Sequence, residues 1–151
     1  MTEPITFLMG KHAAELRADR RYCRNHMWCL PVDSRLRFGF SSYAIRLMQD
    51  VYFLEWTFDA PRSVALKEEI GFLESSKAQS ALYAPLAGRI ECFNQALLSD
   101  PSAINVDGYG DGWLFEMTAE PIATMDVTEY HAYLTANWEV TQRIIKKQVL
   151  E

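Results

Sequence analysis

Lys77 is the residue whose surroundings most favour a chemical role. It lies in ESSKAQS, residues 74–80, where its neighbours are small or polar, and the apolar runs IGFL and ALYAPLAGRI flank this segment. The pattern predicts two strands joined by a tight turn with the lysine at its tip. A rigid hairpin that exposes an uncrowded amine suits covalent attachment of a group that a partner must reach. Exposed lysines are also ordinary surface residues, so on composition alone a plain solvated turn stays open.

Thiol chemistry and metal binding are the other candidates. The chain has three cysteines, Cys23, Cys29 and Cys92. An odd number without a secretory signal predicts reduced thiols and no disulfide framework. No CxxC pair or His/Cys cluster has the spacing of a zinc site, so we expect no metal. Taken alone, each cysteine is most simply a small buried hydrophobic residue.

Length, charge and hydropathy limit the classes of protein to which the chain could belong. The 151 residues fit one domain with a sizeable core, and 49% of them are hydrophobic. A net charge of −5 argues against nucleic acid and anionic membrane as partners. No apolar run approaches the roughly 20 residues of a spanning helix. The N-terminal charges follow the short apolar patch, which is the reverse of a secretory signal, so we expect a cytoplasmic protein.

Short strands separated by turns fill most of the chain, and the expected helices lie at the periphery of the fold. Leu36, Phe38 and Phe40 alternate with polar or small residues, which is the period of a half-buried strand. Asp126, with Glu129 three residues later, forms a capping box before a long C-terminal helix. This order of elements predicts a small β sandwich or barrel with peripheral helices. Strands are expected over 26–32, 34–42, 50–58, 68–74, 80–93 and 113–117. Helices are expected over 11–22, 41–48 and 126–148, and a short helix within 94–105 that ends near Asp100 and Pro101.

The segment around Lys77 resembles the lipoyl-lysine hairpin of the glycine cleavage H-protein family. That family has Glu-Ser-x-Lys-Ala, then Tyr/Ser-x-Pro-x-x-Gly, then Asn-x-x-Leu. DPSAINVDGYGDGWL, residues 100–114, is similar to the family's Asp-Pro-x-x-Ile-Asn…Tyr-Gly-x-Gly-Trp-Leu, and the likeness covers roughly residues 24–145. The matching hairpin positions are Glu74, Ser75, Lys77, Ala78, Ala84, Pro85, Gly88, Asn94 and Leu97.

The resemblance implies a mainly β fold: a lipoyl-domain-like flattened barrel-sandwich hybrid with peripheral helices that include a C-terminal helix. Residues 1–22 would form an N-terminal helical extension, and residues 23–151 the H-protein-like lipoyl carrier domain. A protein of this kind is a carrier and a substrate of partner enzymes, so no enzyme activity and no catalytic residue is expected. Lipoic acid would be bound covalently to Lys77, and the residues presenting it would be Glu74, Ser75, Ser76 and Ala78.

Two departures from the family pattern concern the charge of the cargo. The family has a Glu between the His and Trp of a His-Glu-Trp motif and an Asp four residues after the modified lysine, where this chain has Met27 and Ala81. An ammonium group in a desolvated cleft loses its charge partners without these carboxylates. We therefore expect a cargo other than an amine, although drift with compensation by Glu74 stays an alternative. The residues implied for the arm cleft are His26, Met27, Trp28, Cys29 and Ala81.

One branch of related carriers resembles the chain most closely in RLMQDVYFLEW and IGFLESSKAQS, and in the lack of Leu-Pro-x-x-Gly before the hairpin. This branch is the lipoate-binding proteins of the heterodisulfide-reductase-like sulfur-oxidation system. The resemblance implies a carrier that presents sulfur intermediates to the heterodisulfide-reductase-like complex. Lipoate ligase or lipoyl synthesis enzymes and dihydrolipoamide dehydrogenase would be further partners. The alternatives are a glycine cleavage H-protein carrying the aminomethyl group, a lipoyl relay, and an unmodified binding module.

Overall fold

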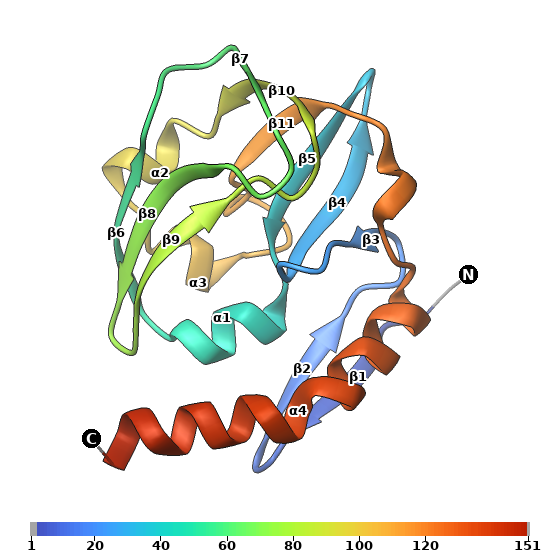
Figure 1. The fold of residues 1–151 in the computed structure, drawn as a ribbon, viewed down its shortest axis with the longest axis vertical. Coiled ribbons are helices and arrows are strands. Elements are labelled where there is room, and N and C mark those ends of the chain that lie inside the picture. The colour runs from blue at the N-terminus through green and yellow to red at the C-terminus, as the bar shows by residue number, and fades with distance from the viewer. Residues whose placement is uncertain (1–2, 151) are drawn as a thin grey trace.

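The computed structural model describes residues 3–150, which form two packed sheets and a separate hairpin (Figure 1). The larger sheet has the strand order β3-β4-β5-β11-β10-β7, the smaller one β6-β8-β9, and the hairpin is β1-β2. Within the described residues the sheets do not close into a barrel. The strands are β1 (Ile5–Met9), β2 (His12–Leu16), β3 (Arg21–Tyr22), β4 (Met27–Val32), β5 (Arg35–Phe40), β6 (Val51–Trp56), β7 (Arg62–Val64), β8 (Glu69–Ser75), β9 (Gln79–Tyr83), β10 (Gly88–Phe93) and β11 (Phe115–Thr118).

Helices are few and lie outside the sheets, as the sequence predicts for a mainly β protein with a C-terminal helix. Three of them are short, and one runs for six to seven turns at the end of the chain. The helices are α1 (Ser42–Met48), α2 (Ala96–Ser99), α3 (Ala103–Val106) and α4 (Val127–Leu150), with a 3₁₀ turn η1 (Pro121–Ala123) before α4.

The main core lies between the six-stranded and the three-stranded sheet. β5 buries Leu36, Phe38 and Phe40, as the alternation in the sequence predicts. From the smaller sheet, Ile70 and Leu73 are completely buried against it. Burying each such side chain stabilises the fold by about 1.5–3 kcal/mol. The core therefore fixes β8, and the hairpin that begins with it, firmly on the larger sheet.

The segment predicted as one strand over 80–93 forms two strands in different sheets. β9 pairs with β8 in the smaller sheet, and β10 pairs with β11 and β7 in the larger one. Pro85 lies in the crossing between them, where a residue without an N–H costs no ladder hydrogen bond. The edge strand β7 lies between the strands expected over 50–58 and 68–74, where the sequence pattern predicts no strand.

The predicted helix over 11–22, and with it a helical N-terminal extension, is wrong. Residues of this segment form β2, which pairs with β1, and Gly10 at the turn has φ of 64°. Ala14 and Leu16 are buried while their neighbours are exposed, which is the period of a strand. The helical propensity of the segment contributes less free energy than burial of the face with Ala14 and Leu16 in the cluster that α1 and α4 help to form, so the segment becomes a strand.

A second core forms where the hairpin, α1 and α4 cover the outer side of β4. The capping box is present at the start of α4: the Glu129 N–H donates to the Asp126 carboxylate at 2.8 Å, and the Asp126 N–H donates to Glu129 at 2.9 Å. The predicted C-terminal helix is thereby confirmed. The term second core is used below for the buried cluster of Phe7, Met9, Ala14, Leu16, Tyr22, Trp28, Tyr43, Tyr130 and Leu134.

Candidate functional site

Lys77 is exposed at the turn between β8 and β9, as the sequence predicts. The turn, residues 75–78, is called the tip below. The Ser75 N–H donates to the Ala78 carbonyl at 2.8 Å, which closes the hairpin. The buried Ser75 hydroxyl accepts from the Ala78 N–H at 3.1 Å, so one side chain also holds the backbone on both sides of the lysine. The tip is therefore ordered although Lys77 itself extends into solvent.

A chain of hydrogen bonds fixes the tip to the rest of the molecule. The Ser76 N–H donates to the Asp50 carbonyl at 2.9 Å, and the Asp50 N–H donates back to the Ser76 hydroxyl at 3.2 Å. Asn105 then holds both sides of Asp50: its amide donates to the Gln49 carbonyl at 2.6 Å and accepts from the Val51 N–H at 2.9 Å. The position of Lys77 thus depends on α3, where Asn105 lies, as well as on its own strands.

An open cavity of about 1080 Å³ lies beside Lys77. In Figure 1 the β8–β9 turn points toward the C-terminal half of α4. The residues that line the cavity come from the tip, α1, the β1–β2 turn and α4, and from the segment 105–109. Its walls combine apolar side chains with amides and hydroxyls, and among the described lining residues there is no Asp or Glu. The lining residues are Met9, Gly10, His12, Ser42, Ile45, Arg46, Leu47, Gln49, Ser76, Lys77, Asn105, Gly108, Tyr109, Trp138 and Gln142.

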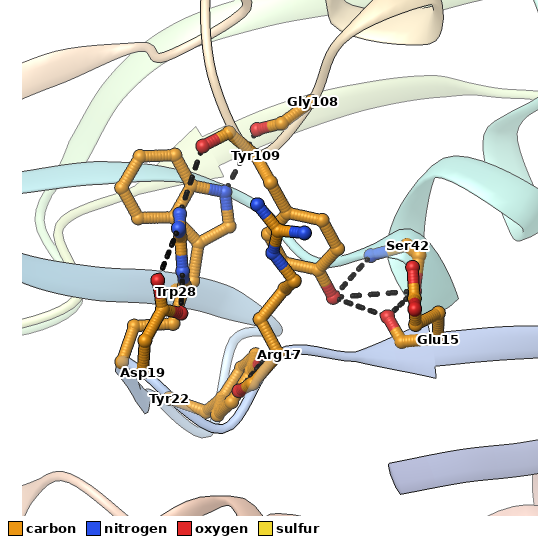
Figure 2. A network of polar contacts seen from close by, with 9 residues as sticks. Glu15, Arg17, Asp19, Tyr22, Trp28, Ser42, Gly108 and Tyr109 are labelled. Carbon is orange, nitrogen blue, oxygen red and sulfur yellow. Dashed lines mark hydrogen bonds and ion pairs between the residues drawn. The ribbon is translucent and has the colours of Figure 1, made fainter. Parts of the chain in front are cut away.

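Polar contacts hold the cavity wall formed by Gly108 and Tyr109. Figure 2 shows the Trp28 indole donating to the Gly108 carbonyl, at 2.8 Å, and the Tyr109 hydroxyl near Glu15 and Ser42. That hydroxyl donates to the Glu15 carbonyl at 2.7 Å and accepts from the Ser42 N–H at 3.2 Å. The wall is therefore tied to β2 and α1 at once.

Four of the five residues expected in the arm cleft are instead structural residues of β4 and the segment before it. Met27 and Cys29 are buried in the main core, and Trp28 in the second core. His26 forms a hydrogen bond of 2.9 Å with Tyr130, and burial lowers the pKa of its imidazole to about 4. None of the four lines the cavity beside Lys77.

Ala81, the fifth expected cleft residue, lies on β9 opposite Phe72. It too is absent from the cavity lining. Sequence reasoning misses Gln49, Asn105 and Tyr109 instead. Asn105 and Tyr109 belong to the motif DPSAINVDGYGDGWL, so that motif could have marked them as positioning residues. Nothing in the sequence indicates that Gln49 has a positive φ, 60°, at the end of α1.

The cysteines have no arrangement that suggests a reactive thiol. Burial raises the pKa of the Cys29 thiol to about 11 and raises that of Cys23 as well. Cys92 is half-buried, and its pKa is raised by burial and by the Glu116 carboxylate, to which its sulfur donates at 3.7 Å. At neutral pH all three are protonated and correspondingly poor nucleophiles.

The described part of the chain has neither a metal-binding cluster nor a membrane-spanning helix. No three His, Cys, Asp or Glu side chains gather there in a way that could hold a metal ion. No helix in that part has the length and apolar character needed to cross a membrane.

Comparison with known proteins identifies the family. The sequence model described as glycine cleavage H-protein matches residues 20–143. The glycine cleavage system H protein of Psychrobacter cryohalolentis is 39% identical over 121 residues, covering 80% of this chain and 91% of that protein. The probable glycine cleavage system H protein of Natronomonas pharaonis is 38% identical over 120 residues, covering 80% and 90%.

A solved structure agrees with the sequence matches. The crystal structure of a glycine cleavage system H protein from Mycobacterium marinum superposes with a TM-score of 0.69 at 31% identity, covering 78% of this chain and 98% of that one. The chain belongs to the glycine cleavage H-protein family, whose members carry a lipoyl group on a lysine and are carrier proteins rather than enzymes.

Proposed function

We propose that Lys77 carries the lipoyl group and that this protein moves a covalently bound group between partner enzymes. The observation that supports the proposal is the exposed lysine on a braced tip beside an open cavity. The residues present suit a lipoyl group. Small side chains flank Lys77, and the cavity has apolar surface from Ile45, Leu47 and Trp138 for a hydrocarbon chain.

The protein holds the attachment point in place and offers a cavity for the attached chain. The lipoyl group, when bound, supplies a dithiol that can bind and release a transferred group. Attachment as an amide removes the positive charge of Lys77. The modified side chain can then lie in the cavity without repulsion from Arg46, which lines it. The amides of Gln49, Asn105 and Gln142 offer hydrogen bonds to a polar cargo. The braced backbone holds the attachment point so that the same site meets each partner.

The cargo we propose is the aminomethyl group of glycine cleavage. Relatives at 38–39% identity over about four-fifths of the chain are named glycine cleavage system H proteins. The partners are then the glycine cleavage enzymes, the enzymes that attach the lipoyl group, and dihydrolipoamide dehydrogenase, which would reoxidise the dithiol.

A sulfur intermediate is the second candidate cargo, favoured by the charge of the cavity. Its described lining contains Arg46 and no carboxylate, so it offers a cationic aminomethyl group no charge partner. A neutral or anionic sulfur species would meet no repulsion there. The partner would be a heterodisulfide-reductase-like complex, and Met27 and Ala81 are where the family pattern has carboxylates.

Intact-mass spectrometry of the carrier separates the two cargoes. The lipoylated protein is incubated with glycine and a glycine decarboxylase in one reaction, and is reduced and given a sulfane-sulfur donor in another. Lys77→Arg is the control in both. A glycine-dependent mass gain that Lys77→Arg lacks supports the aminomethyl carrier, and a gain with sulfur alone supports the second candidate. A lipoylated protein that gains no mass in either reaction would overturn the carrier proposal.

A further inference from the structure

The smaller sheet has an outer face that the main core does not use. Leu54, Leu73 and Leu82 point into the core, so the residues between them point away from it. Strand register places Phe53, Glu74 and Gln79 in one row, and Glu55, Phe72 and Ala81 in the next. The term outer face is used below for Phe53, Glu55, Glu69, Phe72, Glu74, Gln79, Ala81 and Tyr83.

Aromatic rings are unusually accessible on the outer face. Phe53 is 39% exposed and Tyr83 is 48% exposed. The rings of Phe53 and Phe72 lie edge to face with centroids 6.4 Å apart, so they form one apolar surface instead of two isolated side chains. Clustered aromatic rings on a surface are typical of the centre of a protein interface.

Carboxylates surround these rings and have no partner of their own. Glu55 and Glu69 are exposed and Glu74 is half-buried. Within the described residues, no side-chain hydrogen bond or ion pair joins any of the three to the rest of the molecule. The outer face contains no Lys or Arg, so its charge is uniformly negative. A protein that covers it must bring positive charge, because unpaired carboxylates are costly to desolvate.

The outer face is close enough to the tip to be covered together with it. Phe72 precedes Lys77 by five residues, the first of them on β8 and the last two in the tip, so at about 3.3 Å per residue the two lie at most about 16 Å apart. A standard interface covers about 800 Å² on each partner, a patch roughly 16 Å in radius. Such a patch is about 32 Å across, so an enzyme that binds Lys77 near one edge of it reaches the aromatic rings and also Glu69, which precedes Lys77 by eight residues.

We propose that the outer face is the docking surface for the enzyme that attaches the lipoyl group to Lys77, and that Lys or Arg side chains of that enzyme surround an apolar contact there. The proposal rests on the proposed function. That enzyme must recognise the protein before any arm is present, so only the tip and the surface beside it are available. A second copy of this chain fits poorly, because two copies would place Glu55, Glu69 and Glu74 against their equivalents, on chains of net charge −5 each.

Kinetics of lipoyl attachment test the docking surface. The cognate attaching enzyme acts on the full-length unmodified protein, and the product is quantified by intact mass at several protein concentrations. The variant Glu55→Gln with Glu69→Gln removes two charges from the outer face. We expect KM to rise about tenfold while kcat changes by less than about twofold, and we expect binding of the unmodified protein, measured by titration calorimetry, to weaken equally and to depend less on salt.

A matched control removes the same charge elsewhere. Asp33→Asn with Glu120→Gln alters two exposed carboxylates outside the outer face. This control should keep the wild-type KM. Phe53→Ser should also raise KM, since it removes an exposed ring whose loss costs the fold little.

Each remaining outcome contradicts the proposal in a distinguishable way. An unchanged KM for the outer-face variant, with wild-type protein modified normally, would overturn the docking surface alone. An equal rise in the control would assign the effect to net charge. Sedimentation that shows wild-type dimers dissociated by the same substitutions would assign the surface to a second copy. No modification of wild-type protein would overturn the proposed function and this surface with it.

Discussion

The tip and the second core are held in opposite ways. The tip has an exposed lysine, small neighbours and backbone hydrogen bonds, with Asn105 as the anchor. The second core has fully buried rings, with Tyr22 and Tyr130 stacked at 4.4 Å, and it supports one wall of the cavity. The difference indicates that the interactions that position Lys77 are largely independent of those that stabilise the fold. Substitutions in one region should change one property and spare the other.

Trp28→Ala should have the largest effect on stability. Trp28 is 1% exposed, its indole N–H donates to Gly108, and the Arg20 guanidinium lies over its ring at 4.6 Å. Truncating a buried aromatic residue costs about 3–5 kcal/mol. Urea unfolding followed by fluorescence or circular dichroism measures this loss.

Trp28→Phe serves as the matched control for the indole hydrogen bond. It keeps a buried aromatic ring but removes the N–H and part of the indole, so the free energy of unfolding should fall by about 1–3 kcal/mol, the cost of leaving the Gly108 carbonyl unpaired plus some lost packing. If Trp28→Ala unfolds at the wild-type urea concentration, the second core does not have the structural role assigned to it.

Acid should weaken the second core through His26. Burial lowers its pKa to about 4 from an ordinary 6.5, and its ring lies among Tyr43, Tyr130 and Tyr133; among the described residues no ion pair joins it to a carboxylate. A lowered folded-state pKa means that protons favour the unfolded chain. The folded state therefore has its full stability above pH 6.5, where His26 is neutral in both states. As pH falls toward 4 the unfolded chain takes up the proton first, and the free energy of unfolding decreases by about 2–3 kcal/mol.

The pH dependence is measured as unfolding free energy between pH 7 and pH 4.5. His26→Asn keeps a residue that tolerates the positive φ of 71° and removes the titrating group, so its stability should vary less over this range. His12→Asn, at an exposed position, is the control and should behave like the wild type. Parallel curves for wild type and His26→Asn would contradict the assignment.

The contrast between the two regions also explains what the sequence could predict. ESSKAQS between apolar runs predicts the hairpin and its exposed lysine, because strand period and turn chemistry are local. The helix over 11–22 is wrong because burial of Ala14 and Leu16 against distant α1 and α4 decides that segment. The residues expected in the arm cleft around His26 and Trp28 do not line the cavity beside Lys77, because short-range pattern does not tell that β4 is covered on both faces, by the main core and by the second core.

Asn105→Ala should lower the rate of lipoyl attachment at the tip more than it lowers the free energy of unfolding. Its amide holds Gln49 and Val51, and through them the Asp50 contact to Ser76. Losing two hydrogen bonds costs about 1–2 kcal/mol, and the rate of lipoyl attachment should fall several-fold because the tip loses its support.

The control for this anchor is Asn137→Ala. Asn137 donates to a carbonyl within α4 and has no contact with the tip, so the attachment rate should stay at the wild-type value. Intact mass against time gives both rates. Equal rates for the two variants would show that the tip keeps its geometry without Asn105.

Ser76→Ala should have the smallest effect. It removes the hydroxyl that accepts from the Asp50 N–H, but the stronger contact from the Ser76 N–H to Asp50 remains. The residue is exposed, so unfolding free energy should change by less than about 0.5 kcal/mol. Attachment of the lipoyl group should slow by no more than about twofold, measured in the same assay. A loss as large as that of Asn105→Ala would place the critical anchor at the hydroxyl.

The central claim is that Lys77 is the attachment site, and peptide mapping of the modified protein tests it most directly. Protein produced in a host with active lipoyl attachment is digested, and each lysine-containing peptide is weighed. We expect one lipoyl increment, on the peptide that contains Lys77, and none in Lys77→Arg, which should unfold at the same urea concentration as the wild type. Lys67→Arg, at another exposed turn lysine, should keep the increment. An increment on any other lysine, or one that persists in Lys77→Arg, would contradict the account.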